Sequence, residues 1–200
     1  EQSGAQSVVM FLNKFGVTAN FALKIFSQFG TDAVDKIKTN PYMLCSDVSG
    51  IGFKKVDKIG ESLGFSADDE QRVCAGIEYI LLYNSQNGHT YLPKDKLIKL
   101  SCKMLGITET AAENALVSLL MKSRLCSVRG DGFDKIYLYN MYWHERHCAQ
   151  RLVALASKTV SLPKDIENIV DDAENECGIK LEASQREAVM QALSGSTAVI

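Results

Sequence analysis

Apolar positions recur at helical spacing along this chain from residue 1 to residue 64. They predict helices over residues 7–15, 19–29 and 32–38, and the apolar faces of the first two would pack together as a hairpin. Asn40-Pro41 ends the third helix, because a proline disfavours helical backbone angles in the residue before it. A second helical hairpin follows, and the apolar face of its last helix is formed by Val56, Ile59 and Leu63. This whole N-terminal stretch is therefore expected to be helical.

From residue 67 the pattern alternates between helix and strand. Ser66, followed closely by acids, predicts a capped helix start, and Asn87-Gly88 predicts the end of that helix. Gly130-Asp131-Gly132 would join two β-prone runs as a hairpin. The expected order is a short strand at 89–93, helices from about 93 and 108, and strands at 125–128 and 135–139. This is the order of elements in a winged helix.

The remainder of the chain again favours helices. One is expected over 142–157, and a short acidic helix over 164–176. A further helix ends near Leu193, and residues 197–200 begin a buried strand. The helix at 142–157 carries Trp143, Cys148, Leu152 and Leu155, and Trp143 is expected to dock into the core.

The stretch Asp47–Gly64, DVSGIGFKKVDKIGESLG, carries the strongest functional signal. Its two glycines tolerate backbone angles that other residues resist, and the isoleucine between them is expected to hold the turn on the core. A tight turn before a helix exposes bare N–H groups at the positive end of the helix dipole, which suits a phosphate. Three lysines add mobile positive charge within two turns. The candidate DNA-binding residues are Gly50, Ile51, Gly52, Lys54, Lys55 and Lys58.

The same pattern occurs earlier in weaker form, where Gly16-Val17-Thr18 aligns with Gly50-Ile51-Gly52. An internal repeat of helix, glycine turn and helix predicts a tandem helix-hairpin-helix module, which grips the DNA backbone without reading bases. Gly16 and Thr18 are therefore further candidates for DNA contact. A glycine that caps one helix before the next begins explains this first copy equally well.

Charge, cysteine spacing and hydropathy limit the functions that this chain could have. The net charge is −2, so DNA binding must come from local charge, and residues 1–60 carry seven lysines against five acids whereas 161–182 carry two lysines against seven. The six cysteines stand more than twenty residues apart, without metal-ligand spacing, and are expected to be reduced core residues. No run is apolar enough to span a membrane and no secretory signal begins the chain. A cytoplasmic location without a membrane partner is expected.

Three stretches carry a family resemblance. They are Asn40-Pro41-Tyr42 with Gly50–Lys54 and Asp57-Lys58-Ile59 behind it, then Gly88–Pro93, then Leu181 with Ser184–Val189. In this order they resemble the long form of the RecD-like DNA helicases of superfamily one, which are relatives of the exodeoxyribonuclease V alpha chain. The similarity covers essentially the whole chain.

The resemblance implies an ATP-driven helicase that moves 5′ to 3′ on single-stranded DNA in repair or recombination, with ATP and Mg²⁺ as cofactors. The fold class is then mainly α, with a tandem helix-hairpin-helix over 1–66, a winged-helix-like α+β connector over 67–160 and the first elements of a RecA-like α/β lobe over 161–200. In that family the glutamine matching Gln185 recognises adenine, since one carboxamide can both donate to and accept from an edge of the base.

The sequence also departs from the family. It contains no G-x-x-x-x-G-K-[ST] phosphate loop, and neither an Mg²⁺-binding acid nor an arginine finger can be assigned, so the motor is expected to be cut off just before its catalytic loop. Lys55 and Val56 stand where the family usually has smaller residues.

Other functions stay open beside DNA binding. The front module could instead dock a partner protein, with its hairpins used as packing. A helix-hairpin-helix glycosylase would need a catalytic acid, for which Asp68 and Asp69 lie at a suitable distance. His144 and Cys148 could share a helix face, but a metal site needs three or four ligands, and none is expected.

We predict that this 200-residue chain alone hydrolyses no ATP, because it lacks the loop that cradles the phosphates. A malachite-green phosphate assay with excess single-stranded DNA and Mg-ATP tests this. Phosphate release should stay at the level of a protein-free blank, and turnover well above the blank would refute the prediction.

Overall fold

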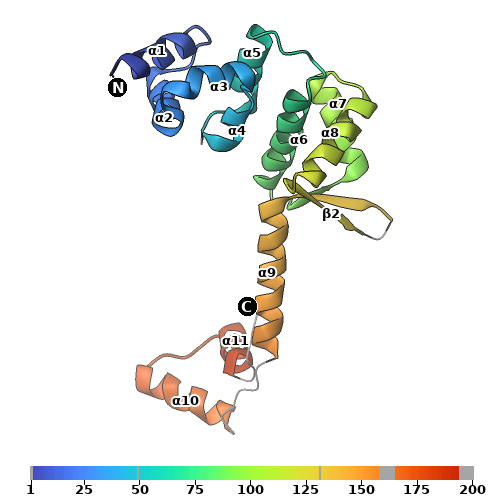
Figure 1. Ribbon diagram of the computed structural model, residues 1–200. Helices are drawn as coiled ribbons and strands as arrows, with labels where there is room; N and C mark the ends of the chain where they lie inside the picture. Colours follow the sequence, from blue (N-terminus) through green and yellow to red (C-terminus); the bar gives the residue numbers. More distant parts are fainter. Residues whose placement is uncertain (1, 49, 131, 158–164, 194–200) are drawn as a thin grey trace. The chain divides into compact units, whose positions relative to one another are not determined.

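The computed structural model describes residues 2–48, 50–130, 132–157 and 165–193 (Figure 1). The chain divides into two compact units, Glu1–Tyr142 and Trp143–Ile200. Helices dominate both units, and a small antiparallel sheet lies in the first. Within the described ranges, no helix combines the length and the apolar character that crossing a membrane requires.

Short helices form the N-terminal half of the first unit. They are α1 (Gln2–Asn13), α2 (Ala19–Phe29), the 3₁₀ turn η1 (Gly30–Asp32), α3 (Ala33–Thr39), α4 (Met43–Asp47) and α5 (Phe53–Ser62). α1 begins well before the predicted start at residue 7. Gly4, which weakens the helical signal in the sequence, is needed for packing, because a Cβ there would lie 3.0 Å from Cγ2 of Thr31.

The two glycine turns share the same backbone geometry. Gly16 and Gly50 both have positive φ, at 69° and 93°. The glycines that follow the next helices, Gly30 and Gly64, again have positive φ, at 62° and 90°. Since glycine populates these angles without the steric cost other residues meet, the repeat seen in the sequence corresponds to a repeat in backbone conformation.

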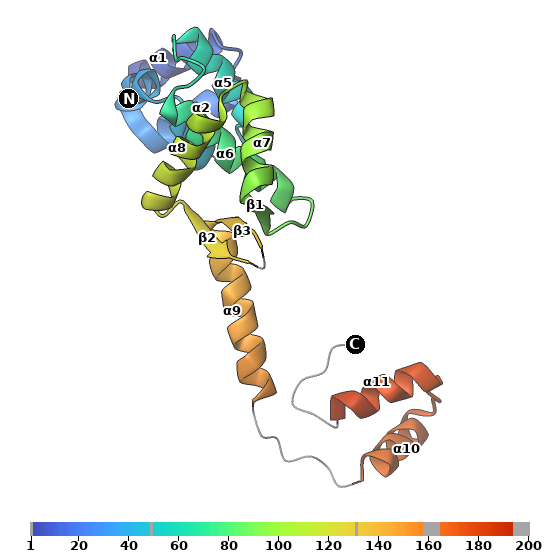
Figure 2. The ribbon, with the colours of Figure 1, turned by 90° about the vertical axis from the view of Figure 1, so that its right-hand side faces the viewer.

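The C-terminal half of the first unit combines three helices with a three-stranded sheet. Its elements are α6 (Glu70–Ser85), β1 (Tyr91–Pro93), α7 (Lys94–Leu105), α8 (Glu109–Met121), β2 (Leu125–Arg129) and β3 (Asp134–Leu138). The antiparallel sheet has the order β1-β3-β2 and packs against all three helices (Figure 2). Leu92 lies opposite Ile136 and Leu125 opposite Leu138, which places the buried leucines and isoleucine on the face toward the helices.

Of the two predicted helix caps, one is wrong and one is confirmed. Ser66 does not cap α6; the N-cap is Asp69, whose Oδ1 accepts from the amides of Gln71 at 2.9 Å and Arg72 at 3.4 Å. The carbonyl of Ser66 instead accepts from the amide of Asp69, which closes a turn before the helix. Thr108 caps α8 as predicted, with Oγ1 accepting from the amide of Ala111 at 3.2 Å.

The helix α9 (Tyr139–Ala156) differs from the expectation in its burial. Trp143 is 39% exposed, Cys148 is exposed, and no described side chain of α9 is buried. The prediction that these residues face a core is therefore wrong here, as it is for Cys177. Periodicity shows that a helix has an apolar face, but it does not show which element covers that face.

The second unit also contains α10 (Ile166–Cys177) and α11 (Ala183–Leu193), which pack together. Arg186 of α11 pairs with Asp171 at 2.6 Å and with Glu174 at 3.3 Å. Val170 of α10 is buried. The strand predicted at 197–200 lies outside the described residues.

A buried ion pair joins the two halves of the first unit. The Asp57 carboxylate of α5 accepts from Nε and Nη2 of Arg72 at 2.8 and 3.0 Å, and from the Tyr42 hydroxyl at 3.0 Å. Nη1 of Arg72 donates to the carbonyls of Ala67 at 2.8 Å and Leu105 at 3.1 Å. Burial, together with the charge and hydrogen bond of Asp57, raises the pKa of Tyr42. Among the described residues, no buried side-chain nitrogen or oxygen lacks a hydrogen-bond partner.

Replacing Asp57 should destabilise the whole first unit. Asp57→Ala leaves the Arg72 guanidinium, whose side chain is 9% exposed, without its countercharge, and we expect the free energy of unfolding to fall by about 3–5 kcal/mol. Urea denaturation followed by circular dichroism measures this. Lys94→Ala is the control, because its ion pair with Glu113 is exposed and its loss should change stability by less than about 1 kcal/mol. Equal effects of the two substitutions would contradict the assignment.

Candidate nucleic-acid interface

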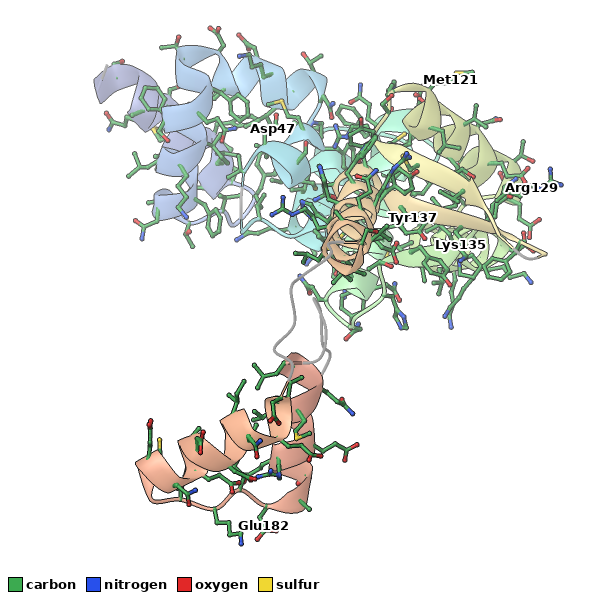
Figure 3. The ribbon with its side chains drawn as sticks, turned by 90° about the horizontal axis from the view of Figure 1, so that it is seen from below. Asp47, Met121, Arg129, Lys135, Tyr137 and Glu182 are labelled. Atoms are coloured by element: carbon green, nitrogen blue, oxygen red, sulfur yellow. The ribbon has the colours of Figure 1, made fainter. Side chains whose placement is uncertain are left out.

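The second glycine turn connects α4 to α5 on the surface of the first unit; Figure 3 labels Asp47, the last residue of α4. Gly50 and Gly52 are exposed, whereas Ile51 between them is only 7% exposed and belongs to the core. The isoleucine therefore holds the turn in place as expected. Gly52 is the N-cap of α5, with extended backbone angles of φ −81° and ψ 150°.

The donors at this turn are open. Among the described residues, the amides of Ile51, Gly52 and Phe53 donate to no protein acceptor, and no side chain caps α5. A Cβ built on Gly52 would meet no atom within 4 Å. The start of a ten-residue helix thus presents its partial positive charge and its N–H groups to an unobstructed space.

The three candidate lysines follow this turn on α5. Lys54 and Lys58 are exposed and four residues apart, so they share a face of the helix, and Lys55 is half-buried beside them. In the described parts of the chain none of the three makes an ion pair with an acid. Their charge is therefore available to an anionic partner.

The first glycine turn is built differently despite its matching backbone. The amide of Gly16 donates to the carbonyl of Asn13 at 3.0 Å, and the amide of Val17 donates to the carbonyl of Leu12 at 3.2 Å. These bonds close the end of α1 as a glycine cap does. Thr18, the N-cap of α2, also places a side chain where Gly52 leaves open space. Gly16 and Thr18 both lie on the surface, and the bond from Gly16 matches the capping alternative. Among the described residues, however, the amides of Thr18 and Ala19 donate to no protein acceptor, so this turn is only partly closed.

A cleft of about 690 Å³ lies beside the second turn, whose residues 50–53 form part of its wall. Its other walls come from α4, α6 and the junction of β3 with α9; they include Tyr79, Leu82 and Tyr139. Sequence reasoning missed this cleft. The available signal was the run Tyr79–Tyr83 in α6, five apolar or aromatic residues in succession, which is more than one buried helix face can accommodate.

Two of the groups that line the cleft, Glu78 and Cys45, have raised pKa values. Burial raises the pKa of the Glu78 carboxyl, although the charge of Arg124 and its hydrogen bonds at 2.8 and 3.0 Å act in the opposite direction. Burial also raises the pKa of the Cys45 thiol to about 12. The thiol therefore stays protonated near neutral pH and is a poor nucleophile.

The remaining candidate residues do not belong to the second glycine turn. Some are far from it in the sequence, and others already make hydrogen bonds within the protein. Gln185 is exposed on α11, where its Oε1 accepts from the amide of Glu182 at 3.1 Å and so helps to start the helix. It is the one adenine-binding candidate, and the described residues offer no phosphate cradle with it. Asp69 is engaged as the cap of α6. His144 and Cys148 are exposed on α9, and no three metal-binding side chains come together within the described part of the chain.

Comparisons with known proteins bear on the same region. Residues 1–91 match the family model described as the HHH domain of the ATP-dependent RecD2 DNA helicase. An ATP-dependent RecD2 DNA helicase of Deinococcus radiodurans is 29% identical over 154 residues, which cover 72% of this chain and 21% of that protein. The chain thus spans about a fifth (21%) of the length of this curated relative.

The same substitution should act oppositely at the two turn glycines. Gly50→Ser forces a side chain onto φ 93°, with its Cβ 3.3 Å from the Phe21 ring, and should lower the free energy of unfolding by about 1–2 kcal/mol. Gly52→Ser leaves the backbone unstrained and supplies a favourable N-cap, so stability should be unchanged or slightly higher. Urea unfolding of both variants measures the difference, and equal losses would argue against this turn geometry.

Proposed function

We propose that the first unit holds the DNA backbone, because residues 1–91 match the HHH-domain model of RecD2 helicases and the chain is similar to a RecD2 DNA helicase. It does so without reading bases, as the front region of an ATP-dependent 5′–3′ helicase of DNA repair or recombination in the cytoplasm. The single observation that carries this proposal is the turn at Gly50–Gly52, whose amides are open and whose approach is unobstructed.

The electrostatics of the turn support a phosphate as the group it binds. Each free amide can donate one hydrogen bond to a phosphate oxygen, and the helix dipole favours the negative charge. Lys54 and Lys55 neutralise charge without requiring a particular base. The contact is therefore with the backbone and independent of sequence, although the chain as a whole is weakly acidic.

The topology supports the finer division of the fold. We infer a tandem helix-hairpin-helix over 1–66, because the two glycine turns have matching backbone angles. We infer a winged helix within 67–160, because α6, β1, α7, α8, β2 and β3 follow one another with the sheet order β1-β3-β2. Residues 161–200 would enter a RecA-like lobe, in which Gln185 contacts the adenine of ATP; the 200 residues contain no G-x-x-x-x-G-K-[ST] loop for the phosphates.

A second candidate function is recruitment of a partner protein. A hollow of about 570 Å³ lies between α6 and α8, where Met121 is 82% and Val117 50% exposed. Exposed apolar side chains at the rim of a hollow are typical of protein contacts. DNA binding and partner docking use different surfaces of the first unit and do not exclude each other.

Removing the two lysines next to the turn tests the DNA-binding proposal. Lys54→Ala with Lys55→Ala should weaken binding equally for all DNA sequences and reduce the salt dependence of the affinity by up to ~2 released counterions. Fluorescence anisotropy with labelled DNA at several salt concentrations measures both quantities. The matched control is Lys96→Ala with Lys99→Ala, which removes two exposed lysines from α7. An unchanged salt slope in the first variant would count against the proposal.

Gly52→Ser provides a second, charge-neutral test. The new hydroxyl would accept from an amide of the first helical turn and occupy the space through which a phosphate must approach. Affinity for DNA should therefore fall while stability does not. Thr18→Ala at the equivalent position of the first turn is the control, and it should leave DNA affinity unchanged because the Thr18 side chain caps no amide of α2.

A further inference from the structure

We propose that the cleft beside the second glycine turn receives an unstacked base of single-stranded DNA, while the turn holds a neighbouring phosphate. The inference rests on the proposed backbone binding and specifies its substrate class. The cleft and the turn form one continuous surface, because Gly50, Ile51, Gly52 and Phe53 line the cleft themselves. Its volume of about 690 Å³ lies within the range of small-molecule sites, ~300–1,000 Å³.

An aromatic stack connects the turn to the interior of the cleft. Phe53, the first residue of α5, packs on Tyr79 with ring centroids 5.5 Å apart and an interplanar angle of 24°. Tyr79 in turn contacts Tyr83, with centroids 6.3 Å apart. Phe53 is only 4% exposed and fixes the ring of Tyr79, which lines the cleft. A base that enters there meets an aromatic platform whose position is set directly by the phosphate-binding turn.

The junction of β3 with α9 supplies an exposed aromatic residue to the same cleft. Tyr139 is the first residue of α9, is 44% exposed, and belongs to the same compact unit as the turn. Its amide donates to the carbonyl of Arg124 at 3.1 Å, which anchors the backbone at this corner. Tyr79 and Tyr139 therefore line one cleft from different elements, which suits a flat, sequence-tolerant ligand such as a nucleobase.

The polar lining fits a base and not a phosphate. The one carboxylate among the lining residues, Glu78, is paired with Arg124 through two hydrogen bonds at 2.8 and 3.0 Å, so this pair offers no net positive charge. The other polar groups, among them Gln86 and Asn140, are neutral and can pair with the edges of bases. Two lysines that make no ion pair within the described ranges, Lys54 and Lys58, lie outside the lining. The DNA backbone is thereby assigned to the second glycine turn and its lysines, and the base to the adjoining cleft.

A strained residue lies in the cleft wall. Ser123 has φ 53°, the left-handed region, and is the one non-glycine residue with positive φ among those described. The amides of Ser123 and Arg124 close the end of α8 on the carbonyls of Leu120 at 3.1 Å and Leu119 at 2.9 Å. The Ser123 residue, whose side chain carries a hydroxyl, also lines the cleft.

The cleft requires a base that is not stacked in a duplex. Bases within a double helix are covered on both faces, and extruding one costs a few kcal/mol. Single-stranded DNA offers unstacked bases without that cost. The expected ligand is therefore a single strand, with base stacking adding to the backbone contact at the turn.

Fluorescence anisotropy at low salt tests the inference with three labelled probes of equal length. They are an oligo(dT) strand, an abasic deoxyribose-phosphate strand and a blunt duplex. The oligo(dT) strand should bind ~5- to 100-fold more tightly than the abasic strand, since stacking on aromatic side chains strengthens binding base by base. It should also bind more tightly than the duplex. Equal affinity for oligo(dT) and abasic strands, or a preference for the duplex, would overturn the inference.

Substitutions of Tyr139 locate the effect in the cleft. Tyr139→Leu should reduce oligo(dT) affinity towards the abasic level without changing abasic binding, whereas Tyr139→Phe, which keeps the ring, should retain it. Phe133→Leu is the control, because Phe133 is a similarly exposed aromatic residue, 41%, outside the cleft. Circular dichroism verifies that all variants are folded. An oligo(dT) affinity that is the same in Tyr139→Leu and Tyr139→Phe would overturn the assignment.

The two proposals fail in different ways. If the abasic strand binds and loses affinity in the Lys54→Ala, Lys55→Ala variant, but oligo(dT) gains nothing, backbone binding stands and base capture is wrong. If neither single strand binds even at low salt, the backbone proposal itself is wrong.

Discussion

The charge pair between Asp57 and Arg72 sets how the two halves of the first unit meet. Both groups are largely removed from water, which costs several kcal/mol per ion unless hydrogen bonds replace those of the solvent. Here Arg72 donates to one carboxylate and two carbonyls. Because the guanidinium is planar, these bonds fix the orientation of the groups around it as well as their distances. A hydrophobic replacement could fill the same volume, but it would not define the angle between α5 and α6.

That angle matters because the two helices carry the two sides of the candidate site. α5 begins at the open turn, and α6 carries Tyr79 and Glu78 into the cleft wall. Gly60 contributes to the same arrangement, since a Cβ there would lie 2.8 Å from Cζ of Tyr42 and displace the ring that donates to Asp57. The interaction that stabilises the junction thus also positions the open amides of the second glycine turn relative to the aromatic side chains.

Local signals in the sequence predicted local structure well. The glycines of both turns, the threonine cap of α8 and the hairpin at 130–132 are each determined by residues within a few positions, and the structure confirms these turns, this cap and the strands on either side of the hairpin. The candidate lysines likewise follow the turn by simple helical spacing. Where two capping residues compete, as Ser66 and Asp69 do, local preference does not decide between them.

Properties that depend on distant partners were not predictable. Arg72 reads in the sequence as an ordinary surface charge, and its burial depends on an acid in another helix, Asp57. The cleft requires knowledge of how α4, α6 and β3 are placed, which no periodicity gives. The exposure of Trp143 has the same origin, because an apolar face predicts burial only if something covers it.

The closed hydrogen bonds of the first turn have a mechanical consequence for any strand held by the second. Two equivalent phosphate contacts at a fixed spacing would have to break together before the strand could advance. The free-energy barrier to that movement would be the sum of the two contacts. The amides of Gly16 and Val17 are already used within the protein, so the first turn would offer fewer donors than the second and hold the proposed strand more weakly. A duplicated element with two unequal copies would be better suited to guiding a moving polymer than to anchoring it.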